Sequence, residues 1–262
     1  MFEVTETRID DAALQLGFHL APWDEAFFAG RVAAISVIRV PDVDAAAEPF
    51  GRFRKWCAER DVRLVSCRLA QSDLRECGFL EAQGFRFIEL NLRPTRSGLD
   101  EFRADPNLSI EPADPSDTAA ISHIAERIFE TGRLQLDPQI ASAIGDRRYA
   151  AWVARAFEHP GQRVLKCLME SRIIGFMVIE QPTPDSRFWS LVGLAPGLAG
   201  QGLGRRMWQS MLARHHAEGV VEVSTSISSH NVAVLNLYAS LGFRFPAPSM
   251  TLHWCPAGPI TE

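Results

Sequence analysis

A series of glycines between an apolar segment and an amphipathic one most constrains how this chain can fold. The stretch 191–215 reads LVGLAPGLAGQGLGRRMWQSMLARH, in which a strand-like run is followed by Gly197, Gly200, Gly202 and Gly204 and then by a helix-like pattern. Glycines between a strand and a helix let several backbone N–H groups converge near the positive end of the helix dipole. That arrangement suits a pyrophosphate group, although a tight turn without a ligand has the same local sequence.

A dinucleotide-binding fingerprint is the competing functional interpretation of these glycines. The fingerprint G-x-G-x-x-G requires a different spacing from that of Gly200, Gly202 and Gly204, and it belongs in a first βαβ unit. Here the glycines lie late in the chain. The sequence therefore favours a phosphate-binding turn of another kind.

A second motif follows the next predicted strand, in the segment SHNVAVLNLYASLGF at 229–243. Asn231, Leu235 and Tyr238 stand at i, i+4 and i+7, so a helix would place them on one stripe. An amide and a phenol on one stripe are unusual for a helix that serves packing alone. A half-buried packing tyrosine is the alternative interpretation of Tyr238.

These two motifs, in this order, resemble the GNAT superfamily of acyl-coenzyme A-dependent N-acyltransferases. That family has a turn p-x-x-R-G-x-G-x-G and a later helix N-x-x-A-x-x-x-Y-x-x-x-G-F, and Asn231, Tyr238, Gly242 and Phe243 match the second pattern. The resemblance covers roughly residues 107–255. One departure is Ala199, which stands where the family usually has Arg or Gln.

The resemblance implies an α/β GNAT fold, with a mixed, mostly antiparallel twisted sheet flanked by helices. It implies acetyl-CoA as cosubstrate and no metal. Tyr238 would be the general acid that protonates the departing thiolate. The strand end at 191–194 would splay from the strand at 220–227, so that the pantetheine arm lies in the gap and nearby amides bind the thioester carbonyl. The residues implied to bind coenzyme A are Val192, Gly193, Leu194, Ala199, Gly200, Gln201, Gly202, Leu203, Gly204, Arg205 and Asn231.

The sequence does not single out one residue as the general base. Candidate bases by chemistry are Glu180, Glu222, His123 and His230, and a chain of water molecules is the alternative. The pair His215–His216, at a predicted helix C-terminus, is interpreted as a surface feature that complements the helix dipole. No histidine or cysteine spacing indicates a metal site.

The acyl acceptor is predicted from a looser resemblance. FETGRLQLDP at 129–138 and RRYAAWV at 147–153 look like a region of bacterial dTDP-4-amino-sugar acetyltransferases of the dTDP-fucosamine type, and DEAFFAG at 24–30 resembles their N-terminal half. This implies a nucleotide-linked amino sugar as substrate, with Arg133 and Asp137 as acceptor-binding residues. Two alternatives stay open. One is a GNAT enzyme for another small amine, an amino acid or a protein N-terminus, and the other is a non-catalytic acyl-CoA-binding module.

The chain is predicted to contain two domains. The stretch 93–117 is rich in prolines and charges, which suits an exposed connection. Residues 1–104 are predicted to form a degenerate, GNAT-like α/β half and residues 105–262 the catalytic domain. Strands are expected at 31–40, 62–69, 85–92, 108–112, 163–169, 172–180, 187–194, 220–227, 243–245 and 250–254. Helices are expected at 44–60, 72–82, 116–130, 137–158, about 203–219 and 231–241.

Composition narrows the class of protein. The chain of 262 residues has a formal net charge of −5, which argues against a non-specific nucleic-acid binder. The five cysteines form no CxxC pair and fit reduced, buried thiols. No apolar run is long enough to span a bilayer, and the N-terminus lacks a secretory pattern. We therefore expect a cytoplasmic protein that binds a small-molecule amine and neither nucleic acid nor membrane, and a homodimer is left open.

Overall fold

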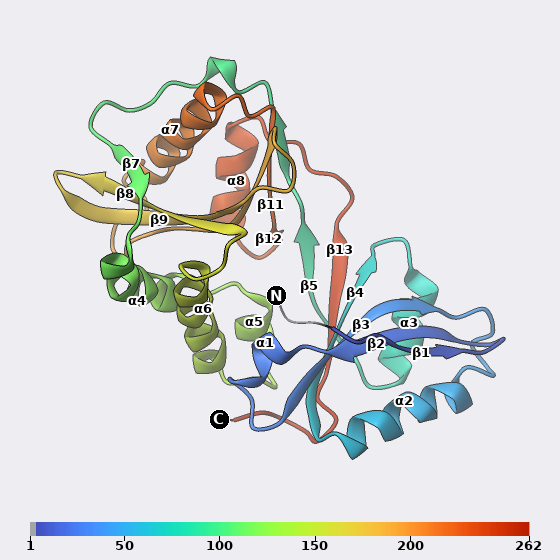
Figure 1. Ribbon diagram of the computed structural model, residues 1–262. Coiled ribbons are helices and arrows are strands. Elements are labelled where there is room, and N and C mark those ends of the chain that lie inside the picture. Colours follow the sequence, from blue (N-terminus) through green and yellow to red (C-terminus); the bar gives the residue numbers. More distant parts are fainter. Residues whose placement is uncertain (1–3, 262) are drawn as a thin grey trace. The chain divides into compact units, whose positions relative to one another are not determined.

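The computed structural model describes residues 4–261, which divide into two compact units that are discontinuous in the sequence (Figure 1). Within the described chain, unit 1 comprises 4–91, 132–145 and 247–261, and unit 2 comprises 92–131 and 146–246. This division differs from a single boundary between residues 104 and 105, because the two ends of the chain contribute to the same unit.

Unit 1 contains a mixed sheet whose last strand comes from the C-terminal segment. In this sheet the strands of the unit follow the order β1, β2, β3, β4, β13 and β5, and β3 and β4 are the parallel pair. Their bounds are β1 (Thr7–Asp10), β2 (Gln15–Leu20), β3 (Arg31–Arg39), β4 (Val62–Ala70), β5 (Arg86–Leu92) and β13 (Ser249–Trp254). The helices of unit 1 are α1 (Pro22–Glu25), α2 (Ala47–Glu59), α3 (Leu74–Ala82) and α5 (Arg133–Leu136).

Helices α2 and α3 bury aromatic side chains against one face of this sheet. Phe50 and Phe53 of α2 and Phe79 of α3 belong to one apolar cluster with Leu252 of β13. Strand β13 lies between β4 and β5 and pairs antiparallel with both. The C-terminal strand is therefore an internal part of the unit 1 core.

Unit 2 contains the second sheet, in the order β6-β11-β10-β9-β8-β7. All neighbours pair antiparallel except β10 and β11, which are parallel. The strands are β6 (Thr95–Ser97), β7 (Ser109–Pro112), β8 (Gln162–Met169), β9 (Arg172–Glu180), β10 (Ser186–Leu194) and β11 (Glu222–Thr225), and β12 (Ile227–Ser228) follows. The helices are α4 (Thr118–Ile128), α6 (Ser142–Ala156), α7 (Leu203–Ala217) and α8 (Val232–Ser240), and the 3-10 turns are η1 (Leu99–Glu101) and η2 (Pro115–Asp117).

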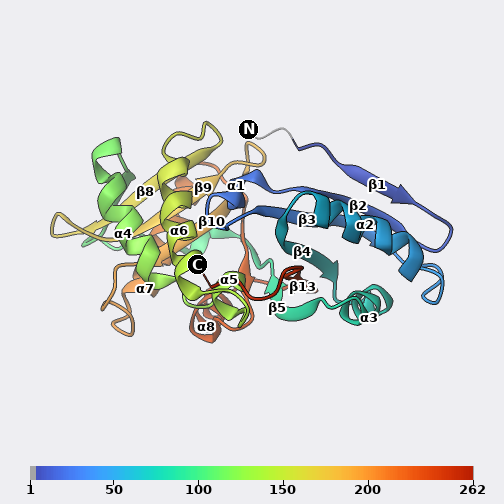
Figure 2. The same ribbon diagram turned by 90° about the horizontal axis from the view of Figure 1, so that it is seen from below.

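Helices cover both faces of the unit 2 sheet. On one face, α7 and α8 pack against alternate strand residues such as Met177 and Trp189. On the other face, α4 and α6 pack against Phe176, Val178 and Leu191. Figure 1 shows these two helix pairs on opposite sides of β8 and β9, and in Figure 2 α4 and α6 lie in front of those strands. The predicted mixed sheet flanked by helices is confirmed.

Three local predictions were wrong. The segment 243–245, predicted as a strand, has only an isolated bridge between Arg244 and Thr95. The stretch 93–117 is not simply an exposed connection, because β6 pairs with β11 and the side chains of Leu99 and Phe102 are buried in the unit 2 core. The single helix predicted over 137–158 is broken: Asp137 is extended, with ψ of 112°, and α6 starts at Ser142. Pro138 is the physical reason, since a residue before proline is disfavoured in the α region.

The sequence analysis also missed the hairpin of β1 and β2, whose strands are short and weakly patterned. As for membrane crossing, none of the helices formed by residues 4–261 combines the length and the apolar character that a bilayer span requires.

Candidate functional site

Strands β10 and β11 run side by side and then part. Their parallel pairing runs from Ser186 with Glu222 to Trp189 with Thr225, and β11 ends there. Strand β10 continues to Leu194. The sheet is therefore open beside the last residues of β10, as the sequence analysis expected.

The open edge of β10 presents backbone N–H groups. Ala195 donates its N–H to the carbonyl of Ile174, on the β9 side. Because successive N–H groups of a strand point to opposite edges, those of Val192 and Leu194 face the side on which β11 has ended. These are two of the residues that the sequence analysis assigned to the thioester carbonyl.

Gly193, between them, sits in a crowded position. A Cβ atom on Gly193 would lie 1.9 Å from Cδ1 of Ile128, at the end of α4. Gly193 pairs with Phe176 across the sheet. Position 193 therefore requires a residue without a side chain. The absence of a side chain at Gly193 lets α4 lie close to the open end of β10.

The glycine-rich turn follows directly. Gly197, Gly200 and Gly202 have φ of 81°, 78° and 74°, in the left-handed region that glycine adopts without strain. Left-handed residues alternating with ordinary ones turn successive N–H groups to one side and form an anion-binding concavity. Around the three glycines the space is open, and the residues 199–202 are exposed.

Helix α7 begins at the last of these glycines. Gly202 is its N-cap, and its first turn carries Arg205 and Arg206. Arg205 donates to the hydroxyl of Ser240 in α8 at 2.7 Å. The positive end of a helix of 15 residues therefore meets the concavity, whereas Arg206 forms an ion pair with Asp105.

Asn231 and Tyr238 belong to α8, as predicted, but their environments differ. Asn231 is the N-cap, and its Oδ1 accepts a hydrogen bond from the N–H of Val234 at 3.2 Å. Tyr238 is buried, with 3% of its surface exposed, and it packs on Trp208 and Phe243. The amide therefore has a helix-capping role in the structure, and the phenol is enclosed.

Burial sets the acidity of Tyr238. It raises the pKa of the phenol to about 12, and the nearby indole of Trp208 and hydroxyl of Thr225 act in the opposite direction. A phenol of this pKa keeps its proton at neutral pH, so it can donate a hydrogen bond or a proton and cannot serve as a base. Thr225 is the last paired residue of β11, so the phenol lies where the strands part.

The candidate bases lie elsewhere. Glu222 begins β11, about 10 Å before the split at about 3.3 Å per residue. Glu180 pairs with Phe188, on the far side of the split from Leu194, and accepts from Gln162 at 2.8 Å. His123 is exposed beside Arg127 on α4. His230, exposed and next to Asn231, is the candidate nearest to the Asn231–Tyr238 helix along the chain.

Arg133 and Asp137 belong to unit 1, where they form a buried network with Asp24 and His253. The carboxylate of Asp137, 1% exposed, accepts from Nδ1 of His253 at 2.8 Å. Arg133 donates to Nε2 of His253 at 3.1 Å and forms an ion pair with Asp24 at 3.2 Å. Because Arg133 can only donate, Nε2 accepts and the imidazole is neutral. Burial lowers the pKa of His253 to about 4 in agreement with this.

The interpretation of His215–His216 as a surface pair was wrong for His215. That side chain is 1% exposed, and its Nε2 accepts from the indole N–H of Trp189 at 3.0 Å. Burial lowers the pKa of His215 to about 4. The helix pattern could have indicated this, since Met207, Met211 and His215 are spaced at i, i+4 and i+8.

The sequence analysis also missed Trp208, Thr225 and Ile128 as neighbours of the site. Each is apolar or weakly polar and matches no position of the two family patterns, so only the close packing of α4, α7 and β11 shows their place. Among residues 4–261, no group of acidic, histidine or cysteine side chains is arranged to hold a metal ion.

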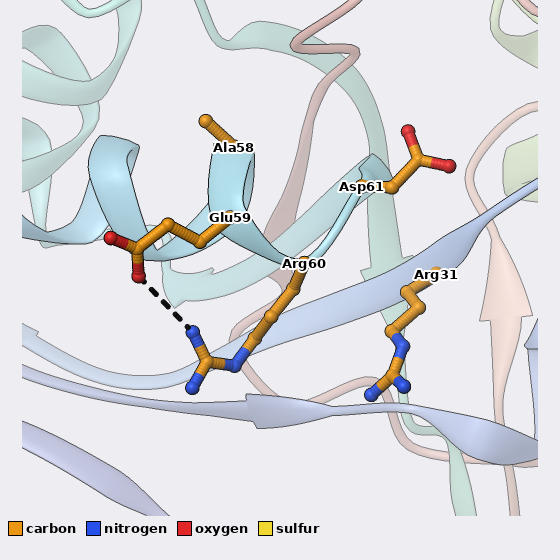
Figure 3. Close-up of a pocket in the computed structure, with 5 residues that line it drawn as sticks. All are labelled: Arg31, Ala58, Glu59, Arg60 and Asp61. Carbon is orange, nitrogen blue, oxygen red and sulfur yellow. Dashed lines mark ion pairs between the residues drawn. The ribbon is translucent and has the colours of Figure 1, made fainter.

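An open hollow in unit 1 is separate from these features. Arg31, Ala58, Glu59, Arg60 and Asp61 line it, with an ion pair of 3.6 Å between Arg60 and Glu59 (Figure 3). Its charges are of both signs, and it contains none of the residues that the sequence analysis selected.

Comparison with known sequences finds similarity in the segment that holds the site. The sequence model of the Acetyltransferase (GNAT) family matches residues 120–243. The L-2,4-diaminobutyric acid acetyltransferase of Nocardia farcinica is 26% identical over 117 residues, which are 44% of this chain and 58% of that protein. The mycothiol acetyltransferase of Frankia casuarinae is 34% identical over 74 residues, 28% of this chain and 21% of that protein. The chain thus spans less than two thirds of the length of either relative.

Comparison with solved structures concerns the fold. A tandem GNAT protein from the clavulanic acid biosynthesis pathway has a TM-score of 0.60 at 14% identity, over 95% of this chain and 85% of that one. At this identity the likeness shows the fold alone.

Proposed function

We propose, from the GNAT family match of residues 120–243 and the parting of β10 from β11, that the chain is an N-acetyltransferase that uses acetyl-CoA. The observation that carries the proposal is the position of that split. It lies between the glycine-rich turn, which suits a pyrophosphate, and Tyr238, which holds a proton. A long, narrow substrate with a phosphate end and a reactive end fits this order.

The residues of the turn suit coenzyme A. In our proposal the backbone N–H groups of residues 199–204 and the N-terminus of α7 bind the pyrophosphate, and Arg205 adds a positive charge. Ala199 contributes only its backbone. Asn231, whose Oδ1 caps α8, keeps its amide N–H groups for the pantetheine arm.

The reaction then needs few groups from the protein. The nitrogen of a neutral primary amine attacks the thioester carbon and forms the new C–N bond, and the N–H group of Val192 or that of Leu194 stabilises the negative charge on the carbonyl oxygen. The C–S bond breaks, its electron pair stays on sulfur, and Tyr238 supplies a proton to that sulfur. The proton released from nitrogen restores the phenol through water, so the products are the amide and free coenzyme A.

The acceptor is proposed as a small molecule with a primary amine. The two curated relatives are named for diaminobutyric acid and mycothiol, which supports a small acceptor without defining it. The resemblance in 129–153 supports a nucleotide-linked 4-amino sugar. Against that finer assignment stands the engagement of Arg133 and Asp137 in the buried network of unit 1.

For the N-terminal half we propose a supporting role. Unit 1, which contains most of residues 1–104, is proposed to be a degenerate GNAT-like domain that binds no coenzyme A, because its strand-to-helix connections hold no run of glycines like that at 197–204. A tandem GNAT protein of similar fold supports such a pair of related halves. One common feature is the left-handed glycine that ends α3 and α8, at Gly84 and Gly242.

The test combines binding and turnover on the whole chain. Calorimetry should detect acetyl-CoA binding, and a thiol-release assay should detect transfer to 2,4-diaminobutyrate, to a dTDP-4-amino-4,6-dideoxy sugar or to a peptide N-terminus. The amine with the highest kcat/KM would define the acceptor class. Absence of acetyl-CoA binding would reject the proposal, and binding without turnover on any amine would favour an acyl-CoA-binding module.

A further inference from the structure

The indole of Trp208 carries a buried hydrogen-bond donor with no acceptor. The side chain, on α7, is 3% exposed, and among residues 4–261 no acceptor meets its Nε1 in hydrogen-bonding geometry. Buried tryptophan N–H groups normally find a partner, as Trp189 does on His215 at 3.0 Å. The unsatisfied donor in the unit 2 core therefore needs an explanation.

The nearest polar group with a role in the proposed chemistry is the phenol of Tyr238. The two rings pack edge to face, with centroids 6.3 Å apart and planes at 61°. The indole N–H lies close enough to the phenol oxygen to favour its ionised form. Trp208 can only donate, so the phenol oxygen is the acceptor in any bond between them.

The hydroxyl of Thr225 is the second polar group beside the phenol of Tyr238. This hydroxyl donates to the carbonyl of Trp189 at 2.8 Å, so its own proton is committed. In any hydrogen bond between the two hydroxyls, the phenol of Tyr238 would therefore be the donor. The indole of Trp208, the phenol of Tyr238 and the hydroxyl of Thr225 thus lie together where β10 and β11 part, and the hydroxyl is anchored to the carbonyl of Trp189.

We propose that Trp208 is a positioning residue for Tyr238: its indole N–H donates to the phenol oxygen as the phenol gives its proton to the departing sulfur. This inference rests on the proposed acetyl transfer. The proton moves from the phenol oxygen to sulfur, which receives the electron pair of the broken C–S bond. The phenolate that remains is stabilised by Trp208 until the proton released by the amine nitrogen neutralises it.

This role accounts for both unusual features of the pair. A phenol of pKa about 12 is a weak acid for a thiolate, whose conjugate acid has an ordinary value near 8.5. A hydrogen bond to an ionised oxygen is stronger than one to a neutral oxygen. The indole N–H of Trp208, which has no acceptor in the resting state, can therefore form a strong hydrogen bond as negative charge develops on the phenol oxygen. The missing partner of Trp208 is then the phenolate.

A direct test does not depend on turnover. The chain has two tyrosines, so Tyr149→Phe leaves Tyr238 as the single phenol. With 3-fluorotyrosine incorporated in that variant, its ionisation can be followed by absorbance. Adding Trp208→Phe should raise the pKa of this phenol by about one unit, the size of one lost hydrogen bond. An unchanged pKa would overturn the inference, whatever the protein does with acetyl-CoA.

Kinetics give the second test, with Trp56→Phe in unit 1 as the matched control. Trp208→Phe should lower kcat by about tenfold and leave the KM for acetyl-CoA within about twofold, because the change acts on one proton transfer. Fluorotyrosine at Tyr238, a stronger acid, should restore most of the loss. A loss of kcat without rescue would show that Trp208 only packs. A wild-type protein without acyl transfer would instead reject the proposed function.

Discussion

The hydroxyl of Thr225 donates a 2.8 Å hydrogen bond to the carbonyl oxygen of Trp189, at the last pair of residues that join β11 to β10. Beyond this bond the strands separate, and Val192 and Leu194 present N–H groups to the opening. The same hydroxyl lies near the phenol of Tyr238. One threonine thus marks the end of the sheet pairing and lies beside the group that we propose as general acid.

The glycine-rich turn can be tested with a pair of matched variants. Gly202 and Gly219 both have a left-handed φ, 74° and 76°, and open space around the missing Cβ. Valine at either position should strain the backbone to a similar extent. Gly202→Val should also displace the N–H groups that bind pyrophosphate, and should weaken acetyl-CoA binding by at least about tenfold. Calorimetry would contradict the assignment if Gly219→Val weakened binding as much, or if Gly202→Val did not weaken it.

Replacement of Tyr238 separates an enzyme from a binding module. Tyr238→Phe keeps the ring among Trp208 and Phe243 and removes the proton donor. We expect kcat to fall by about 10²–10⁴-fold, the usual range for loss of acid catalysis, with little change in acetyl-CoA affinity. A thiol-release rate within threefold of wild type, at saturating acceptor, would show that water or another group protonates the sulfur.

The contact between Gly193 and Ile128 predicts a compensating pair. Gly193→Ala would place its Cβ 1.9 Å from Cδ1 of Ile128 and should destabilise the protein by about 1–3 kcal/mol, as overpacking of a core usually does. Ile128→Val removes that Cδ1 atom. In urea denaturation the double variant should therefore recover much of the loss, whereas additive losses would show that the two residues do not meet.

The stretch before β7 should behave as core rather than linker. Leu99, 3% exposed, should lose about 2–5 kcal/mol of unfolding free energy on replacement by Ala. Leu74→Ala is the control, because 69% of that side chain is exposed and its loss should stay within about 0.5 kcal/mol. If the two variants had equal urea midpoints, Leu99 would not contribute to the core, and the stretch 93–117 would be an exposed connection.

Two buried histidines predict the response of stability to acid. The pKa of His215 and that of His253 are both lowered from 6.5 to about 4 by burial. Above pH 6.5 neither histidine is charged in the folded or the unfolded chain, so neither affects stability there. Between pH 6.5 and 4 the unfolded chain binds protons that the folded chain does not, and stability should fall by up to about 1.4 kcal/mol per pH unit for each histidine.

His215→Gln tests this pH dependence, since the glutamine side chain keeps an acceptor for the N–H of Trp189. Urea denaturation at pH 7, 5.5 and 4.5 should give a slope that is lower than that of the wild type by up to about 1.4 kcal/mol per pH unit. An unchanged slope would mean that His215 contributes nothing to the acid response.

Much of the candidate site was predictable because its signals are local. Positive φ at Gly200 and Gly202 and the cap at Asn231 follow from residue type and neighbours, and the i, i+4, i+7 spacing placed Tyr238 on its helix. Strand and helix positions in the second half of the chain were also close to those observed, since apolar periodicity there is strong.

The glycine-rich turn before α7 and the identity of the polar groups on α8 follow from the sequence alone. Only the tertiary structure decided that β13 completes the sheet of unit 1, that Asp137 is buried beside His253, and that Trp208 and Thr225 surround the phenol of Tyr238. The two groups of features differ in how far along the chain the residues that determine them lie. Backbone conformation depends on a few neighbouring residues, whereas strand partners and the burial of a polar side chain depend on segments more than a hundred positions apart.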